Sequence, residues 1–214
     1  MEVFKKCGYG IFYALALGVS IYAILFVTVD WVGSEYLKEK FSLTPLAMYL
    51  HMVGGSIALT IGAFQLNSRM RAKSIKLHRT LGKVYVTAVL LSGSAGLYLA
   101  TNSMGGIDAH FGFGTMAFLW LFTVSMAFVQ IKKGNVNAHR YWMIINYSLT
   151  CSAITLRLYL PSFPWLFNVD FITSYIAISW VAWVPNVLVA QLYLLKTKRV
   201  SYSVQRTIDN TLST

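Results

Sequence analysis

Residues 111–131, FGFGTMAFLWLFTVSMAFVQI, run for a full membrane-spanning length without one charged side chain. A helix needs about 20 apolar residues to cross the hydrocarbon core of a bilayer. The rest of the chain has the same character, since 57% of its 214 residues are hydrophobic and only 12% are charged. A soluble domain carries roughly 25% charged residues. The composition therefore excludes a water-soluble domain and predicts an integral membrane protein.

Outward from this run, six stretches qualify as membrane spans: 9–29, 46–65, 81–100, 111–131, 142–160 and 171–195. Polar or Gly- and Pro-containing segments separate them. We expect one all-α transmembrane domain over residues 1–214, with the second to fifth helices as a four-helix core and a short cytoplasmic tail at 196–214. A cleaved signal peptide is the alternative for the first stretch. Its apolar run is too long for that, and no small-residue cleavage site follows before Trp31.

The basic residues predict the orientation of the helices. Fifteen of them fall on one side of the predicted spans, against Lys38 and Lys40 on the other. Short loops rich in Lys and Arg face the cytoplasm, so we expect both termini there. The net charge of +11 is spread between apolar runs and not over one soluble face, which argues against a nucleic-acid partner. The fifteen are Lys5, Lys6, Arg69, Arg71, Lys73, Lys76, Arg79, Lys83, Lys132, Lys133, Arg140, Lys196, Lys198, Arg199 and Arg206.

The four histidines are the candidate metal ligands. Each belongs to a different predicted helix of the core, in the order His51, His78, His110 and His139. The expected topology puts His51 and His110 near the outer face, and His78 and His139 near the inner face. Imidazoles from facing helices can hold a haem as axial ligands. The pattern predicts two haem b groups, one per leaflet, and an electron path across the membrane.

Small residues share a helical face with these histidines. On the second predicted helix, His51 shares a face with Gly55, Ala58 and Gly62, and on the third, His78 shares a face with Gly82, Tyr85, Val89, Gly93 and Gly96. On the fourth, Gly114 and Ala117 lie one and two turns from His110, and on the fifth, Met143, Asn146 and Thr150 share the face of His139. Small residues at such positions leave room for a flat macrocycle. The alternative is that they let neighbouring membrane helices pack closely.

Three arginines are candidates for binding the acidic groups of a cofactor. Arg157 lies inside the fifth predicted span, on the face of His139, where a haem propionate or an anionic substrate would be a suitable partner. The alternative for Arg157 is snorkelling to the outer headgroups. Arg79 and Arg140 each directly follow a histidine and could neutralise propionates or contact lipid phosphates.

Several strings resemble a bacterial membrane family known as domain of unknown function 2306. They are HRTLGKVY at 78–85, HRYWMI at 139–144, LRLY at 156–159 and WVPN at 183–186, with His51, Gly55, Gln65 and Trp120. The resemblance covers roughly positions 45 to 192. It implies a multi-pass protein of the bacterial inner membrane and supplies no activity.

The architecture also resembles the cytochrome b561 family. That family has six spans with cytoplasmic ends and a four-helix core holding two haems b, whose axial ligands pair the second helix with the fourth and the third with the fifth. The likeness pairs His51 with His110 and His78 with His139. It implies electron transfer from a cytoplasmic or quinol donor to an outer acceptor such as ferric iron, with membrane lipid and a second copy of the chain as further partners.

Three other functions remain open on the sequence. A haem- or copper-handling assembly factor could use the same histidines for transient binding. A small-solute transporter or channel is the second, although the predicted spans show no matching pair of Gly- or Pro-broken helices. A structural partner subunit is the third.

Overall fold

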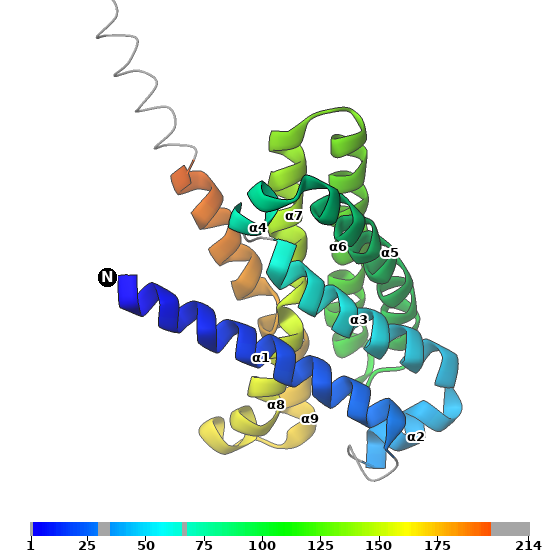
Figure 1. The fold of residues 1–214 in the computed structure, drawn as a ribbon. Helices are drawn as coiled ribbons and strands as arrows, with labels where there is room; N and C mark the ends of the chain where they lie inside the picture. The colour runs from blue at the N-terminus through cyan, green and yellow to red at the C-terminus, as the bar shows by residue number, and fades with distance from the viewer. Residues whose placement is uncertain (1, 30–34, 66–67, 198–214) are drawn as a thin grey trace, which may run out of the picture.

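The computed structural model describes residues 2–29, 35–65 and 68–197, and every regular element within these ranges is a helix (Figure 1). The tail from residue 198 onward lies outside them. The all-α class is confirmed for this part of the chain. The helices are α1 (Glu2–Thr28), α2 (Glu35–Leu43), α3 (Pro45–Gln65), α4 (Ser68–Lys73), α5 (Ile75–Ala100), α6 (Gly106–Lys132), α7 (Val136–Thr150), α8 (Ser152–Phe167) and α9 (Phe171–Val181).

Five helical segments of the described chain are long and apolar enough to cross a membrane. They are Gly10–Thr28 in α1, α3, α5, α6, and the segment Phe171–Thr197 that begins with α9. These five lie within five of the six predicted stretches or extend them by a few residues. The sequence therefore locates five spans, and the sixth differs in the structure.

The stretch 142–160 forms parts of two helices in place of one continuous helix. A turn at Cys151 separates α7 from α8, and neither helix alone has spanning length. Residues 161–164 follow the predicted end of this span, so we expected a loop there. That prediction is wrong, because α8 continues through Pro161 and Pro164 to Phe167. These prolines remove only two hydrogen-bond donors, and Ser162 Oγ donates to Leu158 O at 2.8 Å within the same turns.

A second interruption lies in the last span, where Ala182 and Trp183 form a turn before helical residues 184–197. Pro185 follows at once and cannot donate to a preceding carbonyl. The side-chain Nδ2 of Asn186 donates to Ala182 O at 3.2 Å, so a side chain supplies a hydrogen bond to the backbone at this interruption. The interruption at Cys151 involves neither glycine nor proline, so the expectation of no matching pair of Gly- or Pro-broken spans stays a prediction. At Cys151 the backbone stays right-handed helical, with φ −65° and ψ −13°, so that break is a tight turn and not an unwound segment.

The loops between the long helices follow their sequence signals. Ser74 caps α5 by accepting from Leu77 N, and Asn135 caps α7 by accepting from Ala138 N. Gly105, before α6, adopts a φ of +83°, which glycine reaches without strain. Local residues thus fix where α5, α6 and α7 begin.

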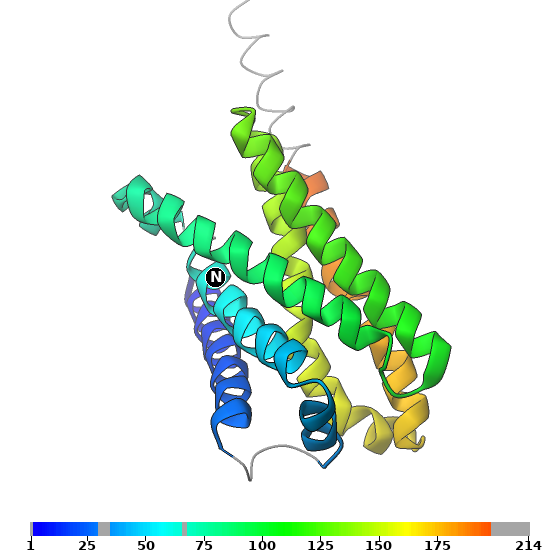
Figure 2. The same cartoon turned by 90° about the vertical axis from the view of Figure 1, so that its right-hand side faces the viewer.

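Four of the elements form a ring. α3 packs on α5, α5 on α6 and α6 on α7, while α7 touches α3 and closes the circle. α5 and α7 therefore lie on one diagonal of this ring, and α3 and α6 on the other. α1 covers α3, and α9 packs against α6 and α8. Figures 1 and 2 show that α4 and the α6–α7 turn lie toward one end of the bundle, and that α2 and the α8–α9 turn lie at the other. We call these the basic end and the opposite end.

Candidate cofactor site

The two predicted histidine pairs occupy the two diagonals of the ring. His78 is on α5 and His139 on α7, whereas His51 is on α3 and His110 on α6. Diagonal helices of a bundle do not pack backbone against backbone, so side chains or a cofactor must fill the space between them. The described residues contain no cluster of three or more metal-ligating side chains, so any metal ligation here rests on pairs.

His78 and His139 lie at the same height in the bundle. Tyr85 Oη donates to Asn146 Oδ1 at 2.6 Å across the α5–α7 diagonal. His78 precedes Tyr85 by seven residues on α5, and His139 precedes Asn146 by seven residues on α7. Seven residues are about two helical turns, or roughly 10 Å. Because α5 and α7 run in the same direction, equal offsets place the imidazoles opposite each other. The two rings are close enough to interact electrostatically.

One nitrogen of His139 is fixed by the backbone. Nδ1 lies 2.9 Å from Ala127 O on α6. A carbonyl oxygen only accepts, so Nδ1 carries the proton and Nε2 keeps its lone pair in the neutral ring. An imidazole oriented by a backbone carbonyl in this way is a common form of metal ligand.

The surroundings of His78 contain polar atoms without partners and open space. His78 Nδ1 and Gln65 Oε1 are buried and make no hydrogen bond to the described residues. Gln65 Nε2 donates to the backbone carbonyl of His78 at 3.0 Å, so the Gln65 side chain lies beside the backbone of His78. A Cβ added to Gly82, one turn from His78 on the face of buried Tyr85, would meet no atom within 4 Å. The residues here fit a bound group that the described chain does not itself supply.

Cationic side chains surround this pair. Arg71 on α4 and Arg79 on α5 both act electrostatically on His78. Arg79 and Arg140 are exposed at the basic end. Carboxylates of a cofactor or lipid phosphates would both be suitable partners there.

His51 and His110 do not share a height. His51 Nδ1 lies 3.1 Å from Ser92 O, and its ring packs on Gly96, where an added Cβ would approach Nδ1 to 2.9 Å. His110 Nε2 lies 3.0 Å from Ser103 O, in the turn after α5. Gly96 lies four residues inside the end of α5, whereas Ser103 lies beyond that end, so His110 contacts the chain further toward the opposite end than His51 does.

Arg157 turns into the bundle. Its Nη1 donates to Ala153 O at 3.0 Å, and its guanidinium carbon lies 5.6 Å from the ring centre of Tyr22 on α1. Its charge also acts on His51. The predicted face relation between Arg157 and His139 assumed one continuous helix, and the turn at Cys151 interrupts it.

Most of the small residues on the histidine faces pack against side chains. Gly62 receives the rings of Tyr147 and Tyr85, and Gly93 receives Leu121. Close packing therefore explains these glycines. Among the glycines predicted to line a macrocycle, Gly82 is the one whose added Cβ meets no atom within 4 Å.

A buried polar network between the histidine levels was missed by the sequence reasoning. Asn146, fully buried, accepts from Tyr85 and donates to Trp120 O and to Thr123 Oγ1, both at 2.8 Å. Thr150 Oγ1 accepts from Trp120 Nε1 at 2.9 Å. Tyr85, Asn146 and Thr150 were assigned to the correct faces, but a polar residue on a membrane helix does not reveal its partner. This network joins α5, α6 and α7.

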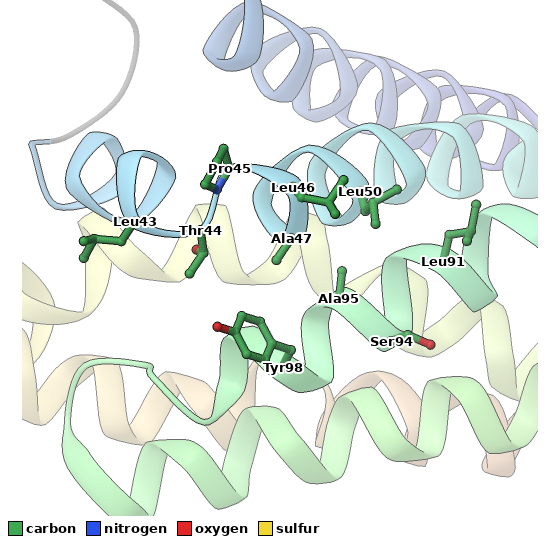
Figure 3. Close-up of a pocket in the computed structure, with 10 residues that line it drawn as sticks. All are labelled: Leu43, Thr44, Pro45, Leu46, Ala47, Leu50, Leu91, Ser94, Ala95 and Tyr98. Atoms are coloured by element: carbon green, nitrogen blue, oxygen red, sulfur yellow. The ribbon is translucent and has the colours of Figure 1, made fainter.

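A groove at the opposite end is separate from these residues. It has a volume of about 440 Å³ and lies between the α2–α3 junction and the last turns of α5 (Figure 3). None of the candidate histidines or arginines lines it. Its lining is mostly apolar: Leu43, Thr44, Pro45, Leu46, Ala47, Leu50, Leu91, Ser94, Ala95 and Tyr98.

Comparison with known proteins gives one match. The family described as "Predicted membrane protein (DUF2306)" matches residues 48–194, which include all four histidines and Arg79, Arg140 and Arg157. No curated protein and no solved structure matches the chain.

Proposed function

The chain belongs to the DUF2306 family of predicted membrane proteins, and we propose that it is a transmembrane electron-transfer protein carrying b-type haem. The observation that supports this proposal is the equal height of His78 and His139 on the α5–α7 diagonal. When bound, a haem between these histidines would supply one-electron redox chemistry.

The residues of the chain have distinct roles in this proposal. His139 presents Nε2, because Ala127 O holds its Nδ1 proton. His78 would be the second ligand, and Gln65 Oε1, which lacks a partner among the described residues, is a buried acceptor that could take its Nδ1 proton. Gly82 leaves space for the flat macrocycle, and Arg71 and Arg79 neutralise the propionates.

The basic end is the cytoplasmic side in this proposal, so the electron donor is a cytoplasmic molecule or a membrane quinol. The acceptor is at the outer face, with ferric iron as one example. The second haem of the proposal lies between His51 and His110. It requires His110 to leave Ser103 O and approach the level of His51, since Ser103 lies beyond the end of α5 and the contacts of His51 lie within that helix.

A haem- or metal-handling assembly factor is the second candidate, because the unpartnered buried atoms of His78 and Gln65 also suit transient binding. The two functions differ in occupancy. An electron carrier retains its haem through purification at a fixed stoichiometry and cycles between two oxidation states. A handling factor releases it to an acceptor protein.

The reduced-minus-oxidised difference spectrum of the purified chain, expressed with a haem supply, tests the proposal. We expect a low-spin bis-histidine haem b signal. His78→Ala and His139→Ala should each remove the same spectral component, about one haem per chain. The double variant should lose little more, because one missing ligand already abolishes the site.

His51→Ala and His110→Ala are the matched controls, since they lie on the other diagonal. They should leave the inner component intact, and if an outer haem exists each should remove it. A wild-type protein without haem, or a His139→Ala variant with full haem content and unchanged bands, contradicts the proposal.

A further inference from the structure

Arg157 holds a positive charge inside the apolar part of the bundle. Its side chain leaves α8 toward α1, with Tyr22 beneath the guanidinium. Among the described residues, the guanidinium has one hydrogen-bond partner, the carbonyl of Ala153 in the preceding turn, which accepts from Nη1. Nε is buried and makes no hydrogen bond to the described residues.

An uncompensated cation in this position is costly. Burying an ionised group away from water costs several kcal/mol unless an opposite charge and hydrogen bonds compensate. The carboxylates whose side chains the structure describes, Glu39, Asp108 and Asp170, are exposed. The described chain therefore supplies a carbonyl and an aromatic ring to Arg157, and no anion.

The remaining edge of the guanidinium offers two parallel N–H donors. Because Ala153 O occupies Nη1, the remaining edge consists of Nε and Nη2. The N–H groups of this edge point in parallel, and a carboxylate or phosphate can accept both at once. The geometry favours an anion with two oxygens available side by side.

Two neighbours complete the surroundings of this edge. The charge of Arg157 acts on His51, whose Nδ1 donates to Ser92 O. Nε2 of the neutral ring therefore carries the lone pair, so it can accept from an O–H group of a ligand and cannot donate to an oxyanion. Tyr22 and His51 each lie six residues from the nearer end of their helix, Thr28 and Pro45. This puts the cluster about 9 Å below the opposite end of the bundle, within reach of a headgroup or a solute that enters from that boundary.

We propose that the Nε and Nη2 edge of Arg157, with Tyr22 beneath the guanidinium, is a binding site for an oxyanion, a carboxylate or a phosphate, between α1 and α8. The anion belongs to a small solute or to a phospholipid headgroup. The site does not rest on the proposed haem between His78 and His139, because these histidines lie at the other end of the bundle. The donors of Arg157 are also not ligands of the second proposed haem, which would lie between His51 and His110.

Thermal unfolding of the detergent-solubilised full chain tests the solute source. Inorganic phosphate and acetate are the probes, each compared with chloride at matched ionic strength. An anion at ten times its dissociation constant should raise the unfolding midpoint by roughly 3–6 °C. Arg157→Gln should abolish this rise, whereas Arg140→Gln, which changes an exposed arginine at the basic end, should retain it.

Phospholipid content tests the headgroup source. Wild type and both variants are reconstituted into phosphatidylglycerol vesicles, re-extracted, and assayed for bound phosphorus. One phospholipid per chain that Arg157→Gln loses and Arg140→Gln keeps identifies a headgroup. If neither probe nor phospholipid binds in an Arg157-dependent manner, the proposal is wrong.

Two further outcomes overturn it. If Asp30→Asn destabilises the chain as much as Arg157→Gln, and the double variant no more than either, Asp30 is an internal counter-ion. If Arg157-dependent binding appears only in chain expressed with haem, the anion is a haem propionate. Should Arg157→Gln fail to fold, Arg157→Lys keeps the charge without the planar edge, and probe binding should weaken at least several-fold.

Discussion

At the scale of single residues, Asn146 determines how three helices meet. Its carboxamide is fully buried and bonds Tyr85 on α5 and both Trp120 O and Thr123 on α6. In a membrane such bonds have no competing water, although partners in the unfolded state reduce their net effect to about 0.6 kcal/mol each on average. Asn146 also sets the register that brings His139 level with His78.

Asn146→Ala should therefore lower the free energy of unfolding by about 2 kcal/mol, because three hydrogen bonds are lost and Tyr85 Oη loses its closest acceptor. Unfolding by SDS in mixed micelles, followed by circular dichroism, measures the change. Ser125→Ala is the control, since that exposed hydroxyl bonds only Leu121 O within its own helix. An Asn146→Ala variant as stable as wild type would show that the network adds nothing to stability.

At the scale of elements, glycines with different surroundings separate packing from cofactor space. On α3, an added Cβ at Gly62 would collide with the ring of Tyr147 and approach Tyr85 Cε2 to 2.8 Å. On α5, an added Cβ at Gly82 would meet nothing within 4 Å. The first glycine serves helix contact, and the second borders the open space beside His78.

Gly62→Ala should destabilise the chain by about 1–3 kcal/mol, because two buried aromatic rings must move. Gly82→Ala should leave stability unchanged or slightly raised, since alanine favours helix. Unfolding in mixed micelles again provides the measurement. Equal losses of stability in Gly62→Ala and Gly82→Ala would contradict the assignment of Gly62 to helix packing and of Gly82 to open space.

Gly82→Phe extends this test to the proposed cofactor. A phenyl ring would fill the space beside His78, so haem content should fall strongly while the helical circular dichroism spectrum stays that of the wild type. Haem extraction and counting against protein gives the ratio. Full haem content in a folded Gly82→Phe variant would place the macrocycle elsewhere.

At the scale of the whole molecule, the sixth crossing of the membrane depends on α7 and α8. Five segments have spanning length by themselves, and α7 and α8 have it only together. Because the backbone at Cys151 remains right-handed helical, we expect α7 and α8 to cross as one broken span. With fifteen basic residues on one side against two on the other, both termini should be cytoplasmic.

Single cysteines in a Cys7→Ser/Cys151→Ser background test this topology in intact cells. Cysteines at Glu35 and Trp165 should react with an impermeant maleimide, and a cysteine at Gly134 and a tag at either terminus should be protected. Permeabilised cells, in which all sites react, are the control. External labelling at Gly134, or protection at Trp165, would show that α7 and α8 do not cross together.

The sequence by itself determined the class of this protein and most of its helices. Hydropathy, charge and capping are local properties. The roles of residues such as Ser74, Gly105 and Asn135 at the starts of helices therefore depend only on their neighbours in the sequence. Local periodicity also predicted that Tyr85 shares a helix face with His78, and that Asn146 shares a helix face with His139. The tertiary structure decided the relative heights and partners of those faces. It brings His78 level with His139, separates His51 from His110, and puts Tyr22 against Arg157. These relations depend on how far one helix is displaced along another. That displacement is fixed by contacts between residues far apart in the sequence, 41 positions for His51 and Ser92 and 61 for Tyr85 and Asn146, which no local pattern encodes.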